Sequence, residues 1–190
     1  MNLPENKGIA IVPYLFKDEK GDTAHPSILL TAKTHGLYFL PGGKIRGEEG
    51  DKDTIDTVIR RLKEDTHLVV THDSVRPIFV RQIGGYIYDV YFAPASGIIS
   101  YEQGKYLGFY FPDRADGTPA EMIDDISQKL LEEFNKYKHQ FSGVYGSIQL
   151  NPTIVKLWQA SIASDQTPMQ DPLEKLRKLF KESLGKERLN

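Results

Sequence analysis

The residues of this chain that could do chemistry gather in one stretch, from Leu40 to Leu68. The stretch begins with a glycine-rich turn, continues through an acidic loop and ends in a helical pattern that carries Glu64 and Asp65 on its polar side. Mg²⁺ prefers carboxylate, carbonyl and water oxygens, and proteins usually hold it with one or two carboxylates plus the phosphates of a substrate. Glycines let the backbone approach a metal or a phosphate closely. The stretch therefore predicts a site for a divalent cation and a phosphate-bearing ligand.

The same stretch resembles the sequence signature of the Nudix hydrolase family, which runs Gly, five residues, Glu, seven residues, then Arg-Glu-apolar-any-Glu-Glu-any-Gly-apolar. Gly43 and Glu49 match the first half of this pattern. Glu48 directly follows a glycine, as the family glutamate usually does, so either acid can be the match. The interval from Glu49 to Arg60 is about three residues longer than in the family pattern, and residues 50–52 are interpreted as the insertion.

The second half of the pattern contains both matches and departures. Arg60 matches the family arginine, and Glu64 and Asp65 match the two metal-binding acids. Arg61 stands where the family has a glutamate that binds metal or acts on the attacking water, and His67 stands where the family has glycine. A guanidinium among metal ligands opposes a neighbouring cation, so Arg61 makes it harder for the site to hold a second metal.

The resemblance implies hydrolysis of a pyrophosphate bond in a nucleoside diphosphate-linked small molecule, with Mg²⁺ or Mn²⁺ as the cofactor. The metal ligands that it implies are one glycine carbonyl and a set of carboxylates: Gly43, Glu48, Glu49, Glu64 and Asp65. The catalytic residues that it implies are Glu64, Arg60, which orients the acids through an ion pair, and Arg61. If the catalytic base lies on a later loop, the acids available are Asp113, Asp116, Glu121, Asp124 and Asp125.

Three other interpretations stay open. The first is a catalytically impaired module of the same fold that binds or senses a nucleotide, which Arg61 favours because a guanidinium can clamp a phosphate. The second is a purely structural module for protein–protein contact, which predicts no effect of Mg²⁺ on stability. The third treats Arg60 with Glu64, and Arg61 with Asp65, as ordinary ion pairs, because residues four apart are neighbours on a helix surface.

The elements that must position these residues are strands and one amphipathic helix. Apolar runs predict strands over residues 9–16, 27–32, 37–40, 68–70, 78–80 and 86–92. The helix pattern begins after Asp53 or Thr54, either of which can cap it, and its apolar stripe is Ile55, Val58, Ile59 and Leu62. The alternating aromatics of 86–92 could stack on a base, but in a strand they more often fill a core.

Further helices are expected towards the C-terminus. Residues 118–121 combine a capping box with proline at the first helical position and predict a second helix. Asn151-Pro152 predicts a third, and Asp171-Pro172, after a linker over 164–170, predicts a fourth. The expected fold is α+β: a Nudix-like α/β/α sandwich with a mixed β-sheet over residues 1–145, and a C-terminal helical extension over 146–190 packed on it.

The composition excludes several classes of function. The chain of 190 residues has 24 basic and 26 acidic side chains, so it lacks the basic footprint of a DNA-binding protein. It has no cysteine, which excludes disulfides and thiolate nucleophiles. No apolar run is long enough to span a membrane and no signal-like N-terminus is seen, so we expect a cytoplasmic protein. The last amphipathic pattern, 173–184, is expected to pack on the domain or on a second subunit, which would make a homodimer.

Overall fold

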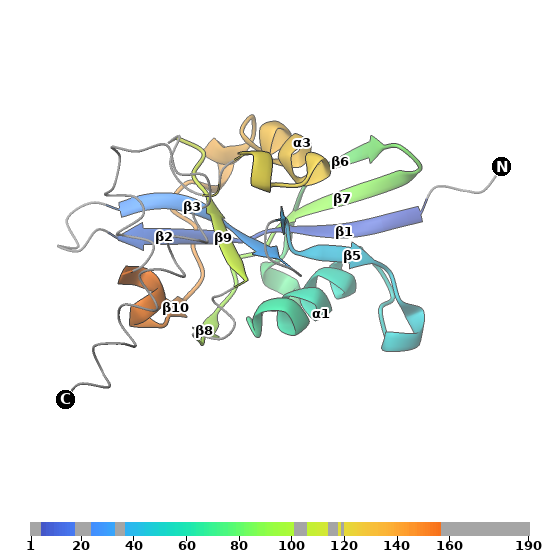
Figure 1. Cartoon of the computed structure of the whole chain (residues 1–190). Coiled ribbons are helices and arrows are strands. Elements are labelled where there is room, and N and C mark those ends of the chain that lie inside the picture. The colour runs from blue at the N-terminus through green and yellow to red at the C-terminus, as the bar shows by residue number, and fades with distance from the viewer. Residues whose placement is uncertain are drawn as a thin grey trace.

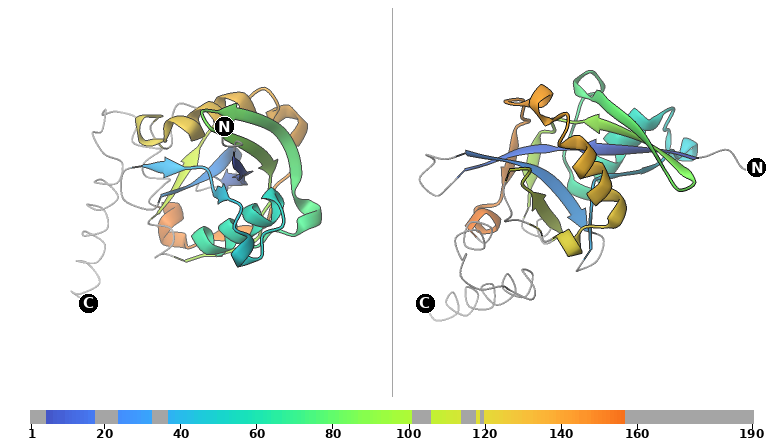
Figure 2. Two further views of the ribbon diagram at one scale, coloured as in Figure 1. Left: turned by 90° about the vertical axis from the view of Figure 1, so that its right-hand side faces the viewer. Right: turned by 90° about the horizontal axis from the view of Figure 1, so that it is seen from above.

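The computed structural model describes residues 5–17, 24–32, 37–100, 106–113, 118 and 120–156. Within these residues, helix α1 (Thr54–Thr66) and helix α3 (Asp125–Phe134) lie on opposite sides of the strands (Figure 1). A view turned by a right angle shows the same layering (Figure 2, left). The α+β class and the α/β/α sandwich predicted from the sequence are confirmed.

The sheet next to α1 is mixed, with the strand order β5-β1-β7-β6. Its strand β1 (Glu5–Ile11) pairs in parallel with β7 (Tyr86–Phe92) and antiparallel with β5 (Gly42–Lys44). Strand β6 (Arg76–Ile83) pairs antiparallel with β7. The parallel pair brings the N-terminal strand beside a strand from the middle of the chain, so the glycine-rich turn and β7 lie on either side of β1.

A second sheet continues from the first. The predicted strand 9–16 is divided at Val12, and β2 (Pro13–Lys17) pairs with β3 (Ala24–Ala32). Strand β3 also pairs with β4 (Tyr38–Phe39) and β9 (Leu107–Tyr110). Strands β8 (Gly97–Ile99) and β10 (Ile148–Leu150) form a small parallel sheet. Short 3₁₀ helices complete the described elements: η1 (Gly47–Glu49), η2 (His72–Ser74), η3 (Ala120–Met122) and η4 (Lys138–Phe141).

Two predicted elements are wrong in place or type. The second helix begins after Asp124, not at residues 118–121, because the Asp124 carboxylate accepts the free backbone N–H groups of Ile126 and Ser127 and so caps the helix there. The predicted strand 68–70 is reduced to an isolated bridge between Val69 and Ser96.

Two apolar clusters fill the space between the layers. The cluster under α1 includes Val58 and Leu62, both fully buried, which is the stripe predicted for that helix. The cluster under α3 includes Leu130 and Phe134. In β7 the aromatic rings mostly serve packing: Phe92, for example, stacks on Phe141 with ring centroids 4.4 Å apart.

The C-terminal part is described only at its beginning. Strand β10 lies against β8, and residues 152–156 are helical. The rest of the predicted third helix, the linker 164–170 and the fourth helix lie outside the described residues, so the division at 145/146 stays a prediction. None of the described helices has the length and apolar character needed to cross a membrane.

Two glycines allow α1, β1 and β5 to come together. A Cβ atom on Gly8 would lie 2.2 Å from the backbone oxygen of Thr54, at the start of α1. Gly42 has φ +153°, which side chains with a Cβ rarely adopt, and a Cβ there would lie 2.2 Å from the oxygen of Gly8. The close approach of helix, strand and turn therefore requires glycine at both positions.

We predict that Gly8→Ala destabilises the protein by about 2–4 kcal/mol, because the added methyl group meets backbone that cannot move aside without shifting α1. Urea unfolding followed by circular dichroism measures this change. Gly47→Ala is the matched control: nothing lies within 4 Å of a Cβ there, so its effect stays within about 0.5 kcal/mol. Equal stabilities of the two variants would contradict this account of the packing.

Candidate functional site

The site is built around two successive arginines of α1. Asp53 caps this helix by accepting the backbone N–H groups of Ile55 and Asp56, which fixes where the helix begins. Neighbours in a helix are turned by roughly 100° from each other. As a result Arg60 reaches the acidic loop before the helix, whereas Arg61 reaches strand β5.

Arg60 is the centre of an ionic network. Its Nε and Nη2 donate to the two carboxylate oxygens of Asp51, at 2.9 Å and 2.8 Å, in a bidentate pair. Its Nη1 lies 2.8 Å from Glu49 and 3.1 Å from Glu64. The guanidinium is therefore surrounded by three carboxylates, of which Asp51 is almost completely buried with 2% of its side chain exposed.

Asp51 organises the loop that it belongs to. Besides Arg60 it accepts the backbone N–H of Arg46 at 2.9 Å and the hydroxyl of Thr57 at 2.8 Å. The hydrogen bonds from Arg60 hold the pKa of Asp51 far below its usual range, against the opposing effect of burial. The same pair raises the pKa of Arg60. The sequence pattern placed Asp51 in the insertion and did not predict this role, in which its carboxylate joins the loop to α1.

Arg61 holds a different set of oxygens. Its Nε donates to the backbone oxygen of Gly42 at 3.3 Å, its Nη1 to Glu64 at 2.9 Å, and its Nη2 lies 2.8 Å from Asp65. The stem of the side chain passes over Gly43. A backbone carbonyl and two carboxylates are ligands of the kind that Mg²⁺ prefers, and here a guanidinium occupies them.

Glu64 lies between the two guanidinium groups. Burial alone would raise the pKa of Glu64, but the hydrogen bonds and charges of Arg60 and Arg61 outweigh it and lower that pKa. Its side chain is 41% exposed, whereas the side chains of both arginines are 13% exposed. Glu64 therefore stays ionised and is the acid of the network most open to solvent.

The acids implied as metal ligands are engaged by arginines in this arrangement, and whether they bind a divalent ion stays a prediction. Glu49, Glu64 and Asp65 are each ion-paired with an arginine, and Gly43 takes part in the ladder between β5 and β1. Glu48 lies exposed in η1.

A different group in the described part of the chain has ligand atoms close enough to surround an ion. Carboxylate oxygens of Asp53 and Asp56 and a ring nitrogen of His72 lie within 4.8 Å of one another. The sequence assigned no role to His72. Asp53 already caps α1, and Asp56 accepts the backbone N–H of Lys52. These hydrogen bonds explain the positions of both carboxylates without a metal ion.

Beside Arg61 a cleft of about 470 Å³ opens between the α1 and α3 layers. Its charged wall has more cations than anions: the cations are Lys7, Lys44, Arg46 and Arg61, and the anions are Asp65 and Asp124. Its apolar wall is formed by Ile9, Phe39, Leu40 and Ile126. The cleft can therefore hold an anion that also carries an apolar part.

The cations of the wall are arranged by neighbouring strands. Lys7 and Lys44 are register partners on β1 and β5, and the Lys7 ammonium lies 3.5 Å from the centre of the Tyr86 ring. Lys44 pairs with Glu5, and Arg46 donates to Glu49 at 2.7 Å. Among the described residues Lys7 has no ion-pair partner, and its ammonium lies over the rings of Tyr86 and Tyr88. Lys7 was not predicted as a site residue, since a single lysine in a strand does not indicate that it lines a cleft.

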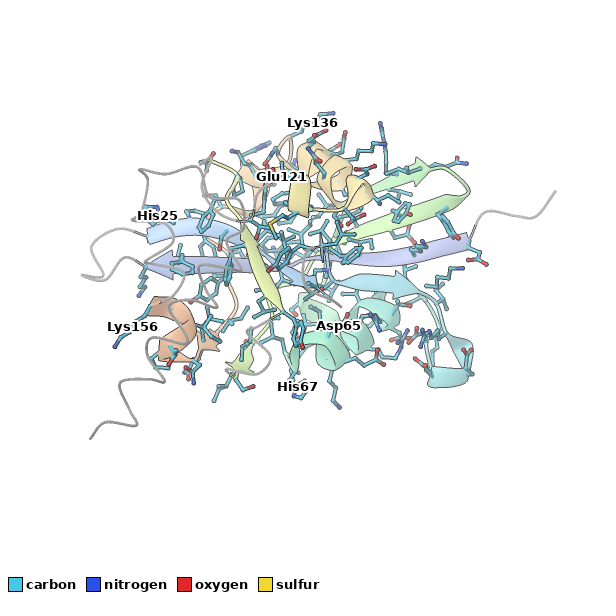
Figure 3. All side chains as sticks on the ribbon, in the orientation of Figure 1. His25, Asp65, His67, Glu121, Lys136 and Lys156 are labelled. Carbon is cyan, nitrogen blue, oxygen red and sulfur yellow. The ribbon has the colours of Figure 1, made fainter. Side chains whose placement is uncertain are left out.

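The later acids proposed as an alternative base are spread over the molecule. Asp124 lines the cleft together with Asp65. Asp113 pairs with Lys138 elsewhere, and Glu121 is exposed in the layer of α3, away from Asp65 in the layer of α1 (Figure 3). Asp125 is exposed, and Asp116 lies outside the described residues. Among those of these acids that the structure describes, only Asp124 lines the cleft.

Comparison with known proteins supports the fold. The sequence matches no protein-family model and no curated protein. Among solved structures, a Nudix hydrolase from Nitrosomonas europaea is 13% identical and matches 80% of each chain with a TM-score of 0.52. A MutT/Nudix family protein from Listeria innocua is 15% identical, and the match covers 74% of this chain and 98% of that one with a TM-score of 0.52.

A third structure, NrtR from Shewanella oneidensis, is 18% identical, with 95% of this chain and 84% of that chain covered and a TM-score of 0.50. At these identities the likeness establishes the fold alone. The chain thus has the Nudix fold that its resemblance implied, and what it does has to be argued from its own site.

We predict that Asp51→Asn lowers the free energy of unfolding at pH 7 by about 3 kcal/mol, because it leaves Arg60 without its buried charged partner. A carboxylate with a depressed folded-state pKa stabilises the fold above its unfolded pKa and loses this effect as the pH falls. The difference between wild type and variant is therefore expected to shrink below about pH 4.

Urea unfolding at pH 7, 4 and 3 measures this difference. Asp73→Asn, which removes an exposed carboxylate from η2, is the control and is expected to match wild type throughout. A stability gap between Asp51→Asn and wild type that does not change with pH would show that the charge of Asp51 is not what stabilises the loop.

Proposed function

We propose that this chain binds a phosphate-bearing small molecule of the nucleotide type in the cleft beside Arg61, and that it does so without a divalent metal. The observation that carries the proposal is the position of the Arg61 guanidinium. It lines the cleft and at the same time occupies the carboxylates of Glu64 and Asp65 and the carbonyl of Gly42.

The charges of the cleft support binding of an anion. Lys7, Lys44 and Arg46 face the same space as Arg61. Within the described residues Arg61 uses three of the five N–H groups that a guanidinium offers, which leaves two that could donate to phosphate oxygens. Hydrogen bonds between a guanidinium and a phosphate are charge-assisted and often bidentate, which makes them stronger than neutral ones.

The same charges oppose a metal ion. A unit charge 4 Å from another contributes about 4 kcal/mol at an effective dielectric constant of 20, and a divalent ion doubles this repulsion. Such an ion near Glu64 would meet both Arg60 and Arg61, and it would have to displace their hydrogen bonds. Binding of the ligand's phosphates by the resident guanidinium does not have this cost.

A second candidate function is metal-dependent hydrolysis of a pyrophosphate bond, the activity that the sequence resemblance implies. It is favoured by the exposure of Glu64 and Glu49, whose side chains are 41% and 36% exposed, since an ion could reach them from solvent. For this activity Mg²⁺ or Mn²⁺ would have to take Glu64 from the arginines. The two candidates therefore differ in whether a metal is required.

We predict that ADP binds with the same affinity, within about twofold, in EDTA and in Mg²⁺, because the phosphate charge is neutralised by side chains. Arg61→Ala is expected to weaken binding by about tenfold or more, since charge-assisted hydrogen bonds contribute about 1.5–3 kcal/mol. Isothermal titration calorimetry measures both effects. Lys63→Ala removes an exposed cation from the same helix outside the cleft and is expected to leave the affinity unchanged.

Absence of binding in EDTA together with binding in Mg²⁺ would contradict the metal-free proposal. If Lys63→Ala and Arg61→Ala lose the same affinity, the net charge of the protein explains the loss, and a direct contact of Arg61 with the ligand does not.

We predict no metal-dependent phosphate release by the wild-type protein from nucleoside triphosphates, nucleotide sugars or dinucleoside polyphosphates, in an assay coupled to a phosphatase. Arg61→Glu adds a carboxylate beside Glu64 and removes the opposing charge, so Mg²⁺ is expected to raise the melting temperature of this variant but not that of wild type. Turnover by wild type that is lost in Glu64→Gln would establish the hydrolase in place of the binding module.

A further inference from the structure

Strand β6 has one edge along which no described strand lies. The order β5-β1-β7-β6 places it at the end of its sheet, where β7 is the strand that pairs with it. Figure 1 shows β6 on the outer side of the hairpin that it forms with β7, and Figure 2 (left) shows it along the rim of the molecule. The open edge of a sheet presents backbone N–H and C=O groups that can pair with a strand of another chain.

The turn of the hairpin determines which residues direct their backbone groups to this edge. Ile83 and Tyr86 are register partners on either side of the two-residue turn Gly84-Gly85, in which Gly84 has φ +61°. The residues that flank such a turn exchange backbone hydrogen bonds, and along an antiparallel pair every second residue does the same. Counting back from Ile83, we find that Val80 and Gln82 direct their backbone N–H and C=O groups away from β7, to the open edge.

The side chains along this part of β6 are open to solvent. Val80 is 65% exposed, although it is an apolar residue within a strand. Arg81 and Gln82 are exposed as well. Proteins commonly protect an open edge with prolines and bulges, and here Pro77 and the bulge after it lie at the start of β6. The stretch that contains Val80 has neither, so it can accept a partner strand.

We propose that β6 pairs antiparallel with β6 of a second copy of this chain, about a two-fold axis at Val80, and so joins the two sheets into one. In this register Val80 lies opposite Val80 of the partner subunit, and the two residues exchange both backbone hydrogen bonds. Gln82 lies opposite Ile78 of the partner subunit. The contact is the same patch on both copies, as a closed dimer with two-fold symmetry requires.

The side chains complement one another in this register. On one face of the joined sheet the two Val80 side chains meet, and both lose exposed apolar surface. On the other face Arg81 lies opposite Phe79 of the partner subunit, at a position without backbone hydrogen bonds, where side chains approach most closely. Phe79 stacks on Tyr137 with ring centroids 5.5 Å apart, so each guanidinium meets an aromatic surface and gains a cation–π attraction.

The charges also permit this pairing. Residues 78–82 carry one charge, that of Arg81, and the two-fold axis places it opposite an aromatic ring. Like charges directly opposite each other destabilise a strand pair, and this register has none within 78–82. The inference does not depend on the proposed function, because no residue of β6 lines the cleft. It differs from the dimer expected through residues 173–184, which lie outside the described residues.

Analytical ultracentrifugation of the full chain, from the micromolar to the submillimolar range, tests the association. We expect a reversible equilibrium between monomer and dimer. Val80→Glu places two carboxylates opposite each other at the two-fold axis, so the dissociation constant is expected to rise at least about tenfold. Val69→Glu changes a valine that is 58% exposed outside β6, and it is expected to leave the dissociation constant unchanged.

Cross-linking tests the register. The chain has no cysteine, so a single introduced thiol reports one contact. In the proposed dimer the two Cα atoms at position 80 lie about 5.5 Å apart, within the range that a disulfide spans. Val80→Cys is therefore expected to form a covalent dimer under copper–phenanthroline at least about tenfold faster than Val69→Cys, because the pairing holds the two thiols together. Non-reducing gel electrophoresis measures both rates.

Three results would overturn the proposal. The first is a monomer over the whole concentration range. The second is a dimer whose dissociation constant does not change in Val80→Glu, and the third is equal cross-linking of Val80→Cys and Val69→Cys, since either would place the contact outside β6. Circular dichroism checks that Val80→Glu is folded, and the two cysteine variants decide the question if it is not.

Discussion

The bidentate pair between Arg60 and Asp51 is the interaction on which the rest of the site depends. Asp51 holds the backbone of the acidic loop through Arg46 and holds α1 through Arg60 and Thr57. A charge buried to this extent is stable only when hydrogen bonds and an opposite charge satisfy it. Separating the loop from the helix would therefore cost several kcal/mol of stability, about the cost of breaking a buried ion pair. The position of the loop then places Glu49 against Arg60, and one helical turn places Glu64 there as well.

With Arg60 committed to Asp51, Arg61 decides the chemistry of the cleft. Its guanidinium takes the carbonyl of Gly42 and the outer carboxylates, and it brings a permanent positive charge to the wall. The ion-pair interpretation of α1 and the binding-site interpretation are therefore compatible. The same contacts that look like ordinary i, i+3 and i, i+4 pairs neutralise the acids, and the phosphate binding that we propose depends on the positive charge that remains in the cleft wall.

The local signals of the sequence predicted much of this arrangement. The cap at Asp53, the buried face of Val58 and Leu62, and the pairs of Arg60 with Glu64 and Arg61 with Asp65 all depend on short spacings within one helix. The role of Asp51 could not be obtained in this way. It lies among several loop acids of similar type, and only the fold of the loop determines which of them meets Arg60.

The contribution of Tyr88 and Asp124 to the lining of the cleft could not be predicted for a related reason. Tyr88 sits in a strand where aromatic residues normally serve packing, and Asp124 stands a few residues beyond a capping box that predicted the helix start too early. Both residues line one cleft only because the fold brings β7 and the start of α3 together, and no short spacing in the sequence encodes that approach. The cleft is therefore a property of the whole fold: its cations come from β1, β5 and α1 and from the loop that follows β5, and its lining also includes the start of α3.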